Sequence, residues 1–325
     1  MGHCARLSLL LGLGFAGQAS AQSITRLEPV SGEQPVDGTT QTEDVRLSTD
    51  KSRRLTVAVD VAGRGPFRFL VDTGADRTAV SREVVQRLRL APGARAKLHS
   101  VTGVSSVSTA SVPHLRISER QVRSVEAAVL DEHNMGADGV LGTDSLRSQR
   151  VLFDIKNNLL SITPANSRPP RMEEGTVVIE ARRKEGRLIV TEAEADGQPL
   201  DVVVDTGAEI SIGNEALRRA LLGRRQLKAN GTLELLSVTG EKLQGDYLTL
   251  KELSIGGVTL RDLSIVFVDA HTFRQMRLEK KPALLLGMNA IRAFDKVTID
   301  FARKKLRVVV PKGSQTELAA QYAMR

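Results

Sequence analysis

Two aspartates in this chain each stand at the end of an apolar run and are followed by the same three residues. The sequence Asp-Thr-Gly-Ala occurs at positions 72–75 and again at positions 205–208. Charged side chains are seldom buried unless they are paired or serve a function. Two carboxylates held close together do not both ionise, so one acts as a base while the other keeps a proton and acts as an acid. We therefore take Asp72 and Asp205 as a candidate pair for general acid–base activation of a water molecule.

Each aspartate taken alone has a purely structural alternative. An aspartate after a strand often forms an Asx turn, in which the carboxylate bonds nearby backbone and does no chemistry. For a single Asp-Thr-Gly this would be the better interpretation. Because the chain has two copies in matching contexts, the paired site is favoured.

The surroundings of the two aspartates repeat as well. A shift of 133 residues (205 − 72) superposes the first landmarks, and the offset then drifts, as loop insertions would cause. Because the landmarks recur in one order, the chain is predicted to contain a duplicated β-rich lobe. The paired landmarks are Pro66 and Pro199, Asp76 and Glu209, the candidate helix caps Ser81 and Asn214, the Ser-Val-Thr-Gly segments 100–103 and 237–240, the Leu-Gly pairs 141–142 and 286–287, and the closing hairpins 151–162 and 297–310.

This order of motifs resembles the retropepsin-like aspartic protease family. Apolar residues lead into Asp-Thr-Gly-Ala, a glycine-tipped hairpin follows, and apolar-apolar-Gly precedes a short helix, over residues 55–311. The chain is similar to a single-chain, duplicated form of the bacterial exported type. The resemblance implies a mainly β fold of two homologous retropepsin/pepsin-like β-barrel lobes, with a cleft between them and a few short helices. It also implies an aspartic-type endopeptidase that cuts extended polypeptides with one aspartate from each lobe and without a cofactor.

The residues beside each aspartate have physical roles of their own. Glycine lets the backbone turn tightly and present N–H groups to the carboxylate. By resemblance, the threonine hydroxyls bond across the interface and lock the two loops together. Alanine stands where pepsin-like relatives tend to have Ser or Thr, so a hydroxyl that stabilises the charged carboxylate is missing and we expect a less acidic working range. These supporting residues are Thr73, Gly74, Ala75, Thr206, Gly207 and Ala208.

Two further pairs match positions that bind substrate in the family. Asp76 and Glu209 match an acidic residue that holds the substrate backbone, but a surface acid near a helix start explains each equally well. Thr102-Gly103 and Thr239-Gly240 resemble the tips of flaps that close over an extended peptide, and an ordinary surface hairpin is the alternative. Neither hairpin has the Tyr of pepsin-like flaps, which favours two similar flaps of retropepsin type.

The composition favours strands, and the N-terminus favours export. Of the 325 residues 41% are hydrophobic but only 3% are aromatic and none is Trp, so Val, Leu and Ile must fill the core.

Residues 1–21 have the features of a cleaved signal peptide, with Arg6 before an apolar run and Ala19-Ser20-Ala21 at its end, which predicts a periplasmic or secreted protein. A buried N-terminal helix is the alternative. Because the only cysteine, Cys4, lies in this segment, the mature chain would rely on core packing and not on disulfides.

Other function classes find little support in the sequence. The formal net charge is +8, but almost no aromatic residues accompany the basic clusters, so no nucleic-acid partner is expected. No stretch after the signal is long and apolar enough to span a membrane. A polypeptide substrate is the expected partner. A metal site is not expected either, because no i, i+4 spacing relates the five histidines, His3, His99, His114, His133 and His271.

The lobes are predicted to work together in a monomer. One alternative is that each lobe pairs with its equivalent in a second chain. Another is a peptide-binding protein that keeps the same fold without turnover. The leader between the signal peptide and the first lobe is alternatively a propeptide. The predicted divisions are a signal peptide (1–21), a flexible leader (22–50), an N-terminal protease lobe (51–163), a linker (164–175), a C-terminal protease lobe (176–311) and a tail (312–325).

Overall fold

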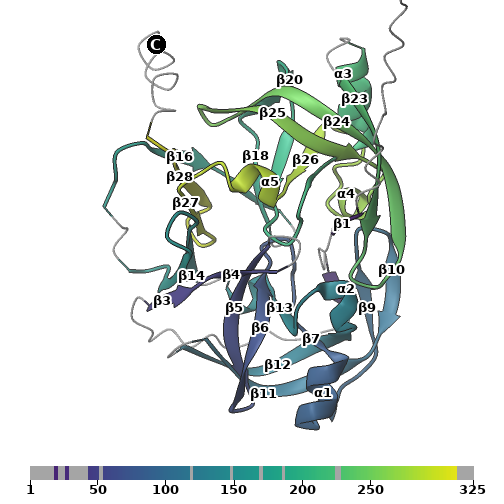
Figure 1. Cartoon of the computed structure of the whole chain (residues 1–325), viewed down its shortest axis with the longest axis vertical. Coiled ribbons are helices and arrows are strands. Elements are labelled where there is room, and N and C mark those ends of the chain that lie inside the picture. The colour runs from purple at the N-terminus through teal and green to yellow at the C-terminus, as the bar shows by residue number, and fades with distance from the viewer. Residues whose placement is uncertain are drawn as a thin grey trace, which may run out of the picture.

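The computed structural model describes residues 18–20, 26–28, 43–50, 54–117, 120–146, 149–167, 171–184, 187–223 and 228–312. Strands dominate these residues and the helices are short. Two lobes lie one above the other in Figure 1, the first half of the chain below and the second above. The mainly β, two-lobed fold with a few short helices is confirmed.

The first lobe is a closed barrel. Its strands, in order around the ring, are β5 (Leu55–Val61), β6 (Arg64–Val71), β13 (Gly139–Leu141), β7 (Ala79–Ser81), β12 (Arg120–Leu130) and β11 (Thr109–Ile117). The ring closes where Leu115 of β11 pairs with Val61 of β5, and both side chains are buried. The short strands β4 (Ser48–Thr49) and β8 (Ala91–Pro92) extend its edges.

The second lobe repeats these pairings within a longer sheet. Its strands in chain order are β17 (Arg182–Lys184), β18 (Arg187–Val190), β19 (Ala193–Ala195), β20 (Gln198–Pro199), β21 (Asp201–Val204), β22 (Ser211–Gly213), β23 (Lys228–Leu236), β24 (Lys242–Ile255), β25 (Val258–Phe267) and β26 (Ala283–Leu286). Strand β21 runs parallel to β26 as β6 runs parallel to β13. Strand β22 pairs with β25 and β26 as β7 pairs with β12 and β13, and β19 pairs with β24 where β5 pairs with β11. The predicted duplication is therefore present strand by strand.

The two longest helices among the described residues begin at the caps that repeat in the sequence. Ser81 Oγ accepts the N–H of Val84 at 3.1 Å before α1 (Arg82–Leu88), and Asn214 Oδ1 accepts the N–H of Leu217 at 2.8 Å before α3 (Glu215–Leu222). Such an oxygen satisfies an N–H for which the helix itself has no acceptor. Within the described part of the chain, no helix has the length and hydropathy needed to cross a membrane. Further short helices are α2 (Glu132–Met135), α4 (His271–Gln275), α5 (Met288–Ile291) and the 3-10 turn Thr143–Ser145.

A six-stranded sheet joins the two halves of the chain, on the left of Figure 1. Its order is β16 (Thr176–Glu180), β28 (Lys305–Val309), β27 (Lys296–Asp300), β14 (Gln149–Asp154), β15 (Leu159–Pro164) and β3 (Glu43–Arg46). The two closing hairpins expected from the sequence meet edge to edge here, with Arg150 of β14 opposite Asp300 of β27. The sequence predicts each of the two hairpins, but it does not predict that strands β14 and β27 pair with one another.

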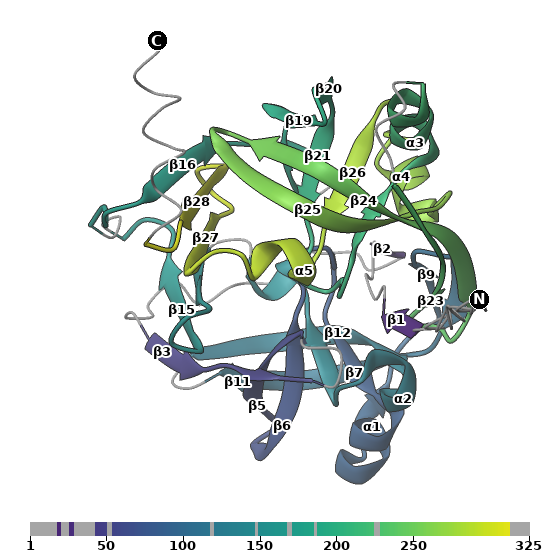
Figure 2. The ribbon, with the colours of Figure 1, turned by 45° about the horizontal axis from the view of Figure 1, so that its top comes forward.

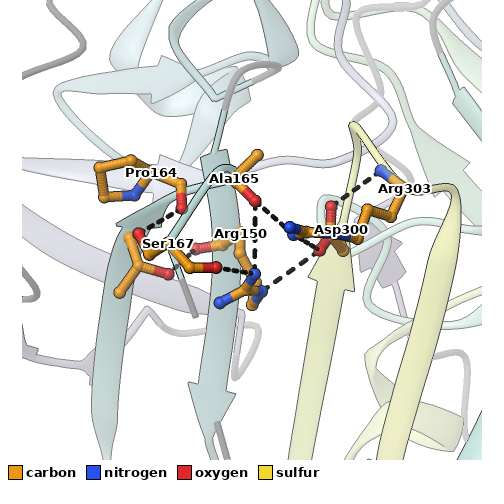
Figure 3. A network of polar contacts seen from close by, with 7 residues as sticks. Arg150, Pro164, Ala165, Ser167, Asp300 and Arg303 are labelled. Carbon is orange, nitrogen blue, oxygen red and sulfur yellow. Dashed lines mark hydrogen bonds and ion pairs between the residues drawn. The ribbon is translucent and has the colours of Figure 1, made fainter. Parts of the chain in front are cut away.

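A buried ion pair holds this junction. Arg150 Nε lies 3.2 Å from Asp300 Oδ2, and the two side chains are 4% and 7% exposed. The Arg150 guanidinium also donates to the carbonyl of Ser167 at 3.1 Å, while Arg303 binds the same carboxylate at 3.1 Å (Figure 3). Because buried charges are tolerated only when their remaining polar atoms are bonded, this network favours one register between the hairpins.

The boundaries of the first lobe differ from the prediction. Strand β3 pairs with β15 and β4 pairs with β5, and the buried Asp50 accepts the backbone N–H and the Nε–H of Arg54, each at 2.8 Å. Residues 43–50 therefore belong to the folded lobe and not to a flexible leader. The sequence has only Val45 and Leu47 as alternating apolar residues here, which is too short a pattern to predict strands.

The other predicted segments are described in part. In the predicted signal peptide only β1 (Gln18–Ser20) is described, and it pairs with β23. In the leader, β2 (Arg26–Glu28) pairs with β9 (Ala96–His99). Positions 168–170 of the linker and all of the tail beyond Lys312 lie outside the described residues.

Two hairpins connect the lobes on the side opposite the six-stranded sheet (Figures 1 and 2). The first hairpin is β9 with β10 (Val104–Val107), and the second is β23 with β24. Val101, at the tip of the first hairpin, packs into the apolar cluster of the second lobe around Val203, whereas Val238 of the second hairpin packs into the cluster of the first lobe around Leu70. The two valines are 2% and 1% exposed. Each hairpin is therefore closed onto the opposite lobe.

Candidate active site

The two aspartates follow equivalent strands at the junction of the lobes. Asp72 comes directly after β6, and Asp205 comes directly after β21. Their backbone N–H groups donate to Leu141 and Leu286 of the neighbouring parallel strands, each at 3.0 Å. Both aspartates are only 1% exposed. The strand ends thus hold two carboxylic groups in the interior at equivalent places.

Each carboxylate is bound by its own loop. Asp72 Oδ1 accepts the N–H groups of Gly74 at 2.8 Å and of Ala75 at 3.0 Å. Asp205 Oδ1 accepts the equivalent N–H groups of Gly207 at 3.0 Å and Ala208 at 3.2 Å. The fourth motif position supplies only its backbone N–H in both loops, as its alanine side chain implies.

The two glycines show that the carboxylates lie against the opposite loops. A Cβ on Gly74 would lie 2.7 Å from Cγ of Asp205, and a Cβ on Gly207 would lie 2.3 Å from Cγ of Asp72. No side chain fits at such distances, so the close approach of the two loops requires glycine at both positions. The structure therefore brings the two predicted aspartates together across the lobe junction.

The threonines bond across the same junction. The N–H of Thr73 donates to Thr206 Oγ1 at 3.0 Å, and the N–H of Thr206 donates to Thr73 Oγ1 at 3.2 Å. The hydroxyls in turn donate to the opposite chain segments, Thr73 to the carbonyl of Val204 at 3.0 Å and Thr206 to the carbonyl of Val71 at 2.6 Å. Because all these groups are buried, the bonds cross-link the two loops in one relative position.

The electrostatics of the pair favour a shared proton. Burial raises the pKa of Asp72 well above its usual range, and the neighbouring charge of Asp205 raises the pKa further. The N–H groups of Gly74 and Ala75 and the charge of Arg187 act in the opposite direction without cancelling the rise. Asp72 Oδ2 is buried and has no hydrogen-bond partner among the described residues. This oxygen is therefore the natural place for the proton.

Arg187 is part of the site although the sequence reasoning did not select it. It comes from β18 of the second lobe, is fully buried, and donates Nε–H at 2.9 Å and Nη2–H at 2.7 Å to the carbonyl of Gly74 in the first lobe. Its Nη2 also lies 3.1 Å from Oδ1 of Asp76. One guanidinium from the second lobe thus supports the loop of Asp72.

The repeat contains a signal that would have found this arginine. A shift of 133 residues places Arg187 on Arg54 (187 − 133 = 54), which is also buried at the start of its lobe. Arg54 bonds Asp50 and donates Nη2–H to the carbonyl of Met135 at 2.6 Å. Two buried arginines at the repeat spacing are unusual because charged side chains are rarely buried without a role.

The two predicted substrate-binding acids lie beside the loops. Asp76 forms the ion pair with Arg187, and its carbonyl accepts the N–H of Asp144 at 3.2 Å. Glu209 is half-buried at the equivalent place, and its carbonyl accepts the N–H of Asn289 at 3.0 Å. Their contact with a substrate stays a prediction.

The structure brings the two predicted hairpin tips together. The hydroxyls of Thr102 and Thr239 both donate to Oε2 of Glu241, at 2.5 and 2.7 Å. Gly240, with φ 89°, lies against α2, since a Cβ there would be 2.9 Å from Nδ2 of Asn134. Glu241 was not among the predicted residues, because it stands one position beyond the repeated Ser-Val-Thr-Gly.

The histidines do not form a metal site within the described part of the chain. His99 Nδ1 lies 2.9 Å from His271 Nε2, and the rings stack at 5.2 Å between centroids. This pair joins the first hairpin to the second lobe, and sequence spacing gives no hint of it. No group of three or more His, Cys, Asp or Glu residues is placed to hold a metal ion among the described residues.

A family model agrees with this geometry. The model described as aspartyl protease matches residues 57–145 and residues 191–290, one region in each lobe. The two matched regions contain both aspartates and both hairpin tips. No curated protein sequence matches the chain significantly.

Proposed function

Because the chain belongs to the aspartyl protease family, we propose that it is an endopeptidase in which Asp72 and Asp205 together activate one water molecule. One observation carries the proposal: the glycine of each Asp-Thr-Gly loop packs directly against the aspartate of the other loop. Two buried carboxyl groups in this arrangement form one site and not two. The threonine bonds across the junction support it by fixing the loops.

We assign the acid role to Asp72 because its Oδ2 is buried without a hydrogen-bond partner among the described residues and because its pKa is raised. Burial and the charge of Asp205 keep Asp72 protonated, so Asp72 is the acid and Asp205 is the base. Asp205 takes a proton from water as the water oxygen bonds to the peptide carbonyl carbon, and Asp72 gives its proton to the carbonyl oxygen. The tetrahedral product is then neutral. The proton held by Asp205 passes to the amide nitrogen, the C–N bond breaks, and a hydroxyl proton of the intermediate returns to Asp72.

The substrate is proposed to be an extended polypeptide. The hairpins reach from each lobe onto the other, so an extended chain bound beside the aspartates would lie beneath both tips. The signal-like residues 1–21 support an exported protein, and the substrate would then be a polypeptide of the periplasm or the exterior.

Asparagine substitutions test the proposal. Asp72→Asn and Asp205→Asn should each lower the cleavage rate of an unfolded polypeptide by about a thousandfold or more, because the pair then lacks its acid or its base. Asp262→Asn is the matched control, since Asp262 is exposed on β25 at φ 52°, a conformation that asparagine tolerates. Circular dichroism would verify that all three variants fold.

The opposite result favours a binding protein. If the wild-type chain cleaves no peptide at any pH between acid and neutral, or if either aspartate variant retains the wild-type rate, the proposed chemistry is wrong. Peptide binding without cleavage would then identify the alternative.

A further inference from the structure

A single carboxylate connects the two hairpin tips. Glu241 directly precedes the return strand β24 of the second hairpin, and its Oε1 accepts the hydroxyl of Ser105 at 3.0 Å. Its Oε2 accepts the hydroxyl of Thr102 at 2.5 Å and of Thr239 at 2.7 Å. Two of the three donors, Ser105 and Thr102, belong to the first hairpin and so to the other lobe. The bond to Thr102 is the largest of the influences that hold the pKa of Glu241 below its usual range.

The two tips are otherwise built alike. In each Ser-Val-Thr-Gly segment the serine and threonine hydroxyls lie 2.8 Å apart, Ser100 with Thr102 and Ser237 with Thr239. The next residue breaks the symmetry, because it is Val104 in the first hairpin, 48% exposed, and Glu241 in the second. One acid therefore serves both tips, and nothing equivalent stands on the first hairpin.

Glu241 borders a cavity into which its side chain can move when its hydrogen bonds break. A polar cavity of about 400 Å³ borders it, lined among others by Arg82, Arg95 and Ser106. The hairpin tips also dock through Val101 and Val238, which are buried in the apolar clusters of the opposite lobes, and through the N–H of His271, which donates to the carbonyl of Val101 at 2.8 Å. Among these contacts, Glu241 bonds both tips with one side chain at an exposed position.

We propose that Glu241 is a latch that holds the two hairpins closed together and so positions them for substrate. The role rests on the proposed function, because closure matters for cleavage only if the cleft binds a peptide. Glu241 does not touch the reacting atoms and is a positioning residue. A hydrogen bond from a hydroxyl to a carboxylate is stronger than one between neutral groups. Loss of this carboxylate should therefore lower the fraction of molecules whose hairpins are closed.

Amide exchange measures closure without any substrate. The His271 N–H is protected by the first hairpin, and the N–H of Asn214, bonded to the carbonyl of Ala283 at 3.1 Å, is a reference inside the second lobe. Glu241→Val, which gives the second hairpin the residue of the first, should accelerate exchange at His271 about tenfold, the size expected for a lost charge-assisted bond at a partly exposed site, and leave Asn214 unchanged. Glu252→Gln changes an exposed acid on β24, the strand that follows Glu241, and as the matched control it should change neither.

Peptide kinetics supply a second readout. Glu241→Val should raise KM about threefold to tenfold with little change in kcat, because the lost interaction favours the closed state before and during the reaction alike. Glu241→Gln, which keeps one acceptor oxygen without the charge, should fall between the wild type and Glu241→Val.

A double-mutant cycle decides whether the hydroxyls of the first hairpin carry the effect. In a Thr102→Val, Ser105→Ala background, adding Glu241→Val should accelerate exchange at His271 by less than twofold further, since the partners are already gone. The latch is refuted if Glu241→Val leaves exchange at His271 as in the wild type, or if it accelerates exchange equally in both backgrounds. If neither the wild type nor any variant cleaves peptide while the exchange results agree with the expectation, the role of Glu241 as a latch is supported and the proposed function is wrong.

Discussion

Asp72 is placed where its charge is disfavoured, and that is the central physical feature of the site. The carboxyl group is buried, faces the second aspartate across a glycine, and receives only backbone N–H bonds from its own loop. Burial and the like charge raise its pKa, so the folded protein holds a proton there that the unfolded chain has already released at the same pH. In the proposed mechanism this proton serves the reaction, and holding it lowers the stability of the fold.

This arrangement predicts that Asp72→Asn stabilises the protein while it abolishes cleavage. Between the usual carboxyl pKa of about 3.9 and the raised value in the fold, the folded state binds more protons than the unfolded state, so its stability falls as pH rises. Asparagine keeps an acceptor for the two N–H groups and has no charge to bury. At pH 7 we expect Tm to rise by about 2–4 °C, corresponding to about 1 kcal/mol in a chain of this size, and the gain to vanish near pH 3.5.

Thermal unfolding at both pH values measures this gain, with Asp262→Asn as the control. An Asp72→Asn variant that is no more stable than the wild type at pH 7, or equally stabilised at pH 3.5, would contradict the assignment of the proton to Asp72.

At the scale of elements, two different devices connect the lobes around the site. The Asp-Thr-Gly loops are joined by fully buried threonine bonds and form a rigid base. The hairpins are held by the exposed Glu241, by the histidine pair, and by Val101 and Val238, which are buried in the opposite lobes. Because the loops are bonded wholly in the interior while the hairpins are held in part by exposed polar contacts, substrate exchange should involve the hairpins while the loops stay in place.

The histidine pair predicts that docking of the first hairpin weakens in acid. Burial, followed by the charges of His99 and Arg274, lowers the pKa of His271. At a pH near and below the usual histidine pKa of about 6.5, the state with the hairpin undocked binds more protons than the docked state. Docking is therefore weakened as the pH falls from the usual histidine pKa through the lowered pKa of His271. Two protonated rings also cannot keep a hydrogen bond between Nδ1 of His99 and Nε2 of His271.

Exchange of the His271 amide, corrected for the intrinsic pH dependence of exchange, provides the measurement. Between pH 7.5 and pH 5 the protection should decrease about tenfold in the wild type and clearly less in His99→Gln, which removes one positive charge of the pair. Equal pH dependence in both proteins would show that the histidines do not govern docking.

At the scale of the whole molecule, the chain contains two copies of one lobe whose Asp-Thr-Gly loops meet at the junction. The duplication could be predicted from the sequence alone. The structure places the repeated aspartates, the caps Ser81 and Asn214 and the glycine-tipped hairpins at equivalent positions of the two lobes. Such features are local, because a cap or a turn depends on a few neighbouring residues. The mainly β fold followed from the scarcity of aromatic residues, the apolar runs and the resemblance.

Apart from the short strands of residues 43–50, the features that the sequence did not reveal are contacts between the copies. The pairing of β14 with β27, the reach of Arg187 to the carbonyl of Gly74, and the bonds of Glu241 to the opposite hairpin join residues far apart in the chain. A hairpin pattern shows which face of a strand is buried but not which strand lies at its edge. A long polar side chain likewise carries no periodic signal of its partner.

Mixing two inactive variants tests most directly whether Asp72 and Asp205 form one site within one chain. Asp72→Asn and Asp205→Asn are purified separately, mixed under conditions that allow chains to exchange lobes, and assayed on an unfolded polypeptide, with the wild type characterised in parallel by light scattering. We expect the mixture to cleave no faster than either variant alone and the wild type to be active as a monomer. Recovery of activity on mixing would contradict this, because it would require the intact aspartates of two different chains to meet in one site.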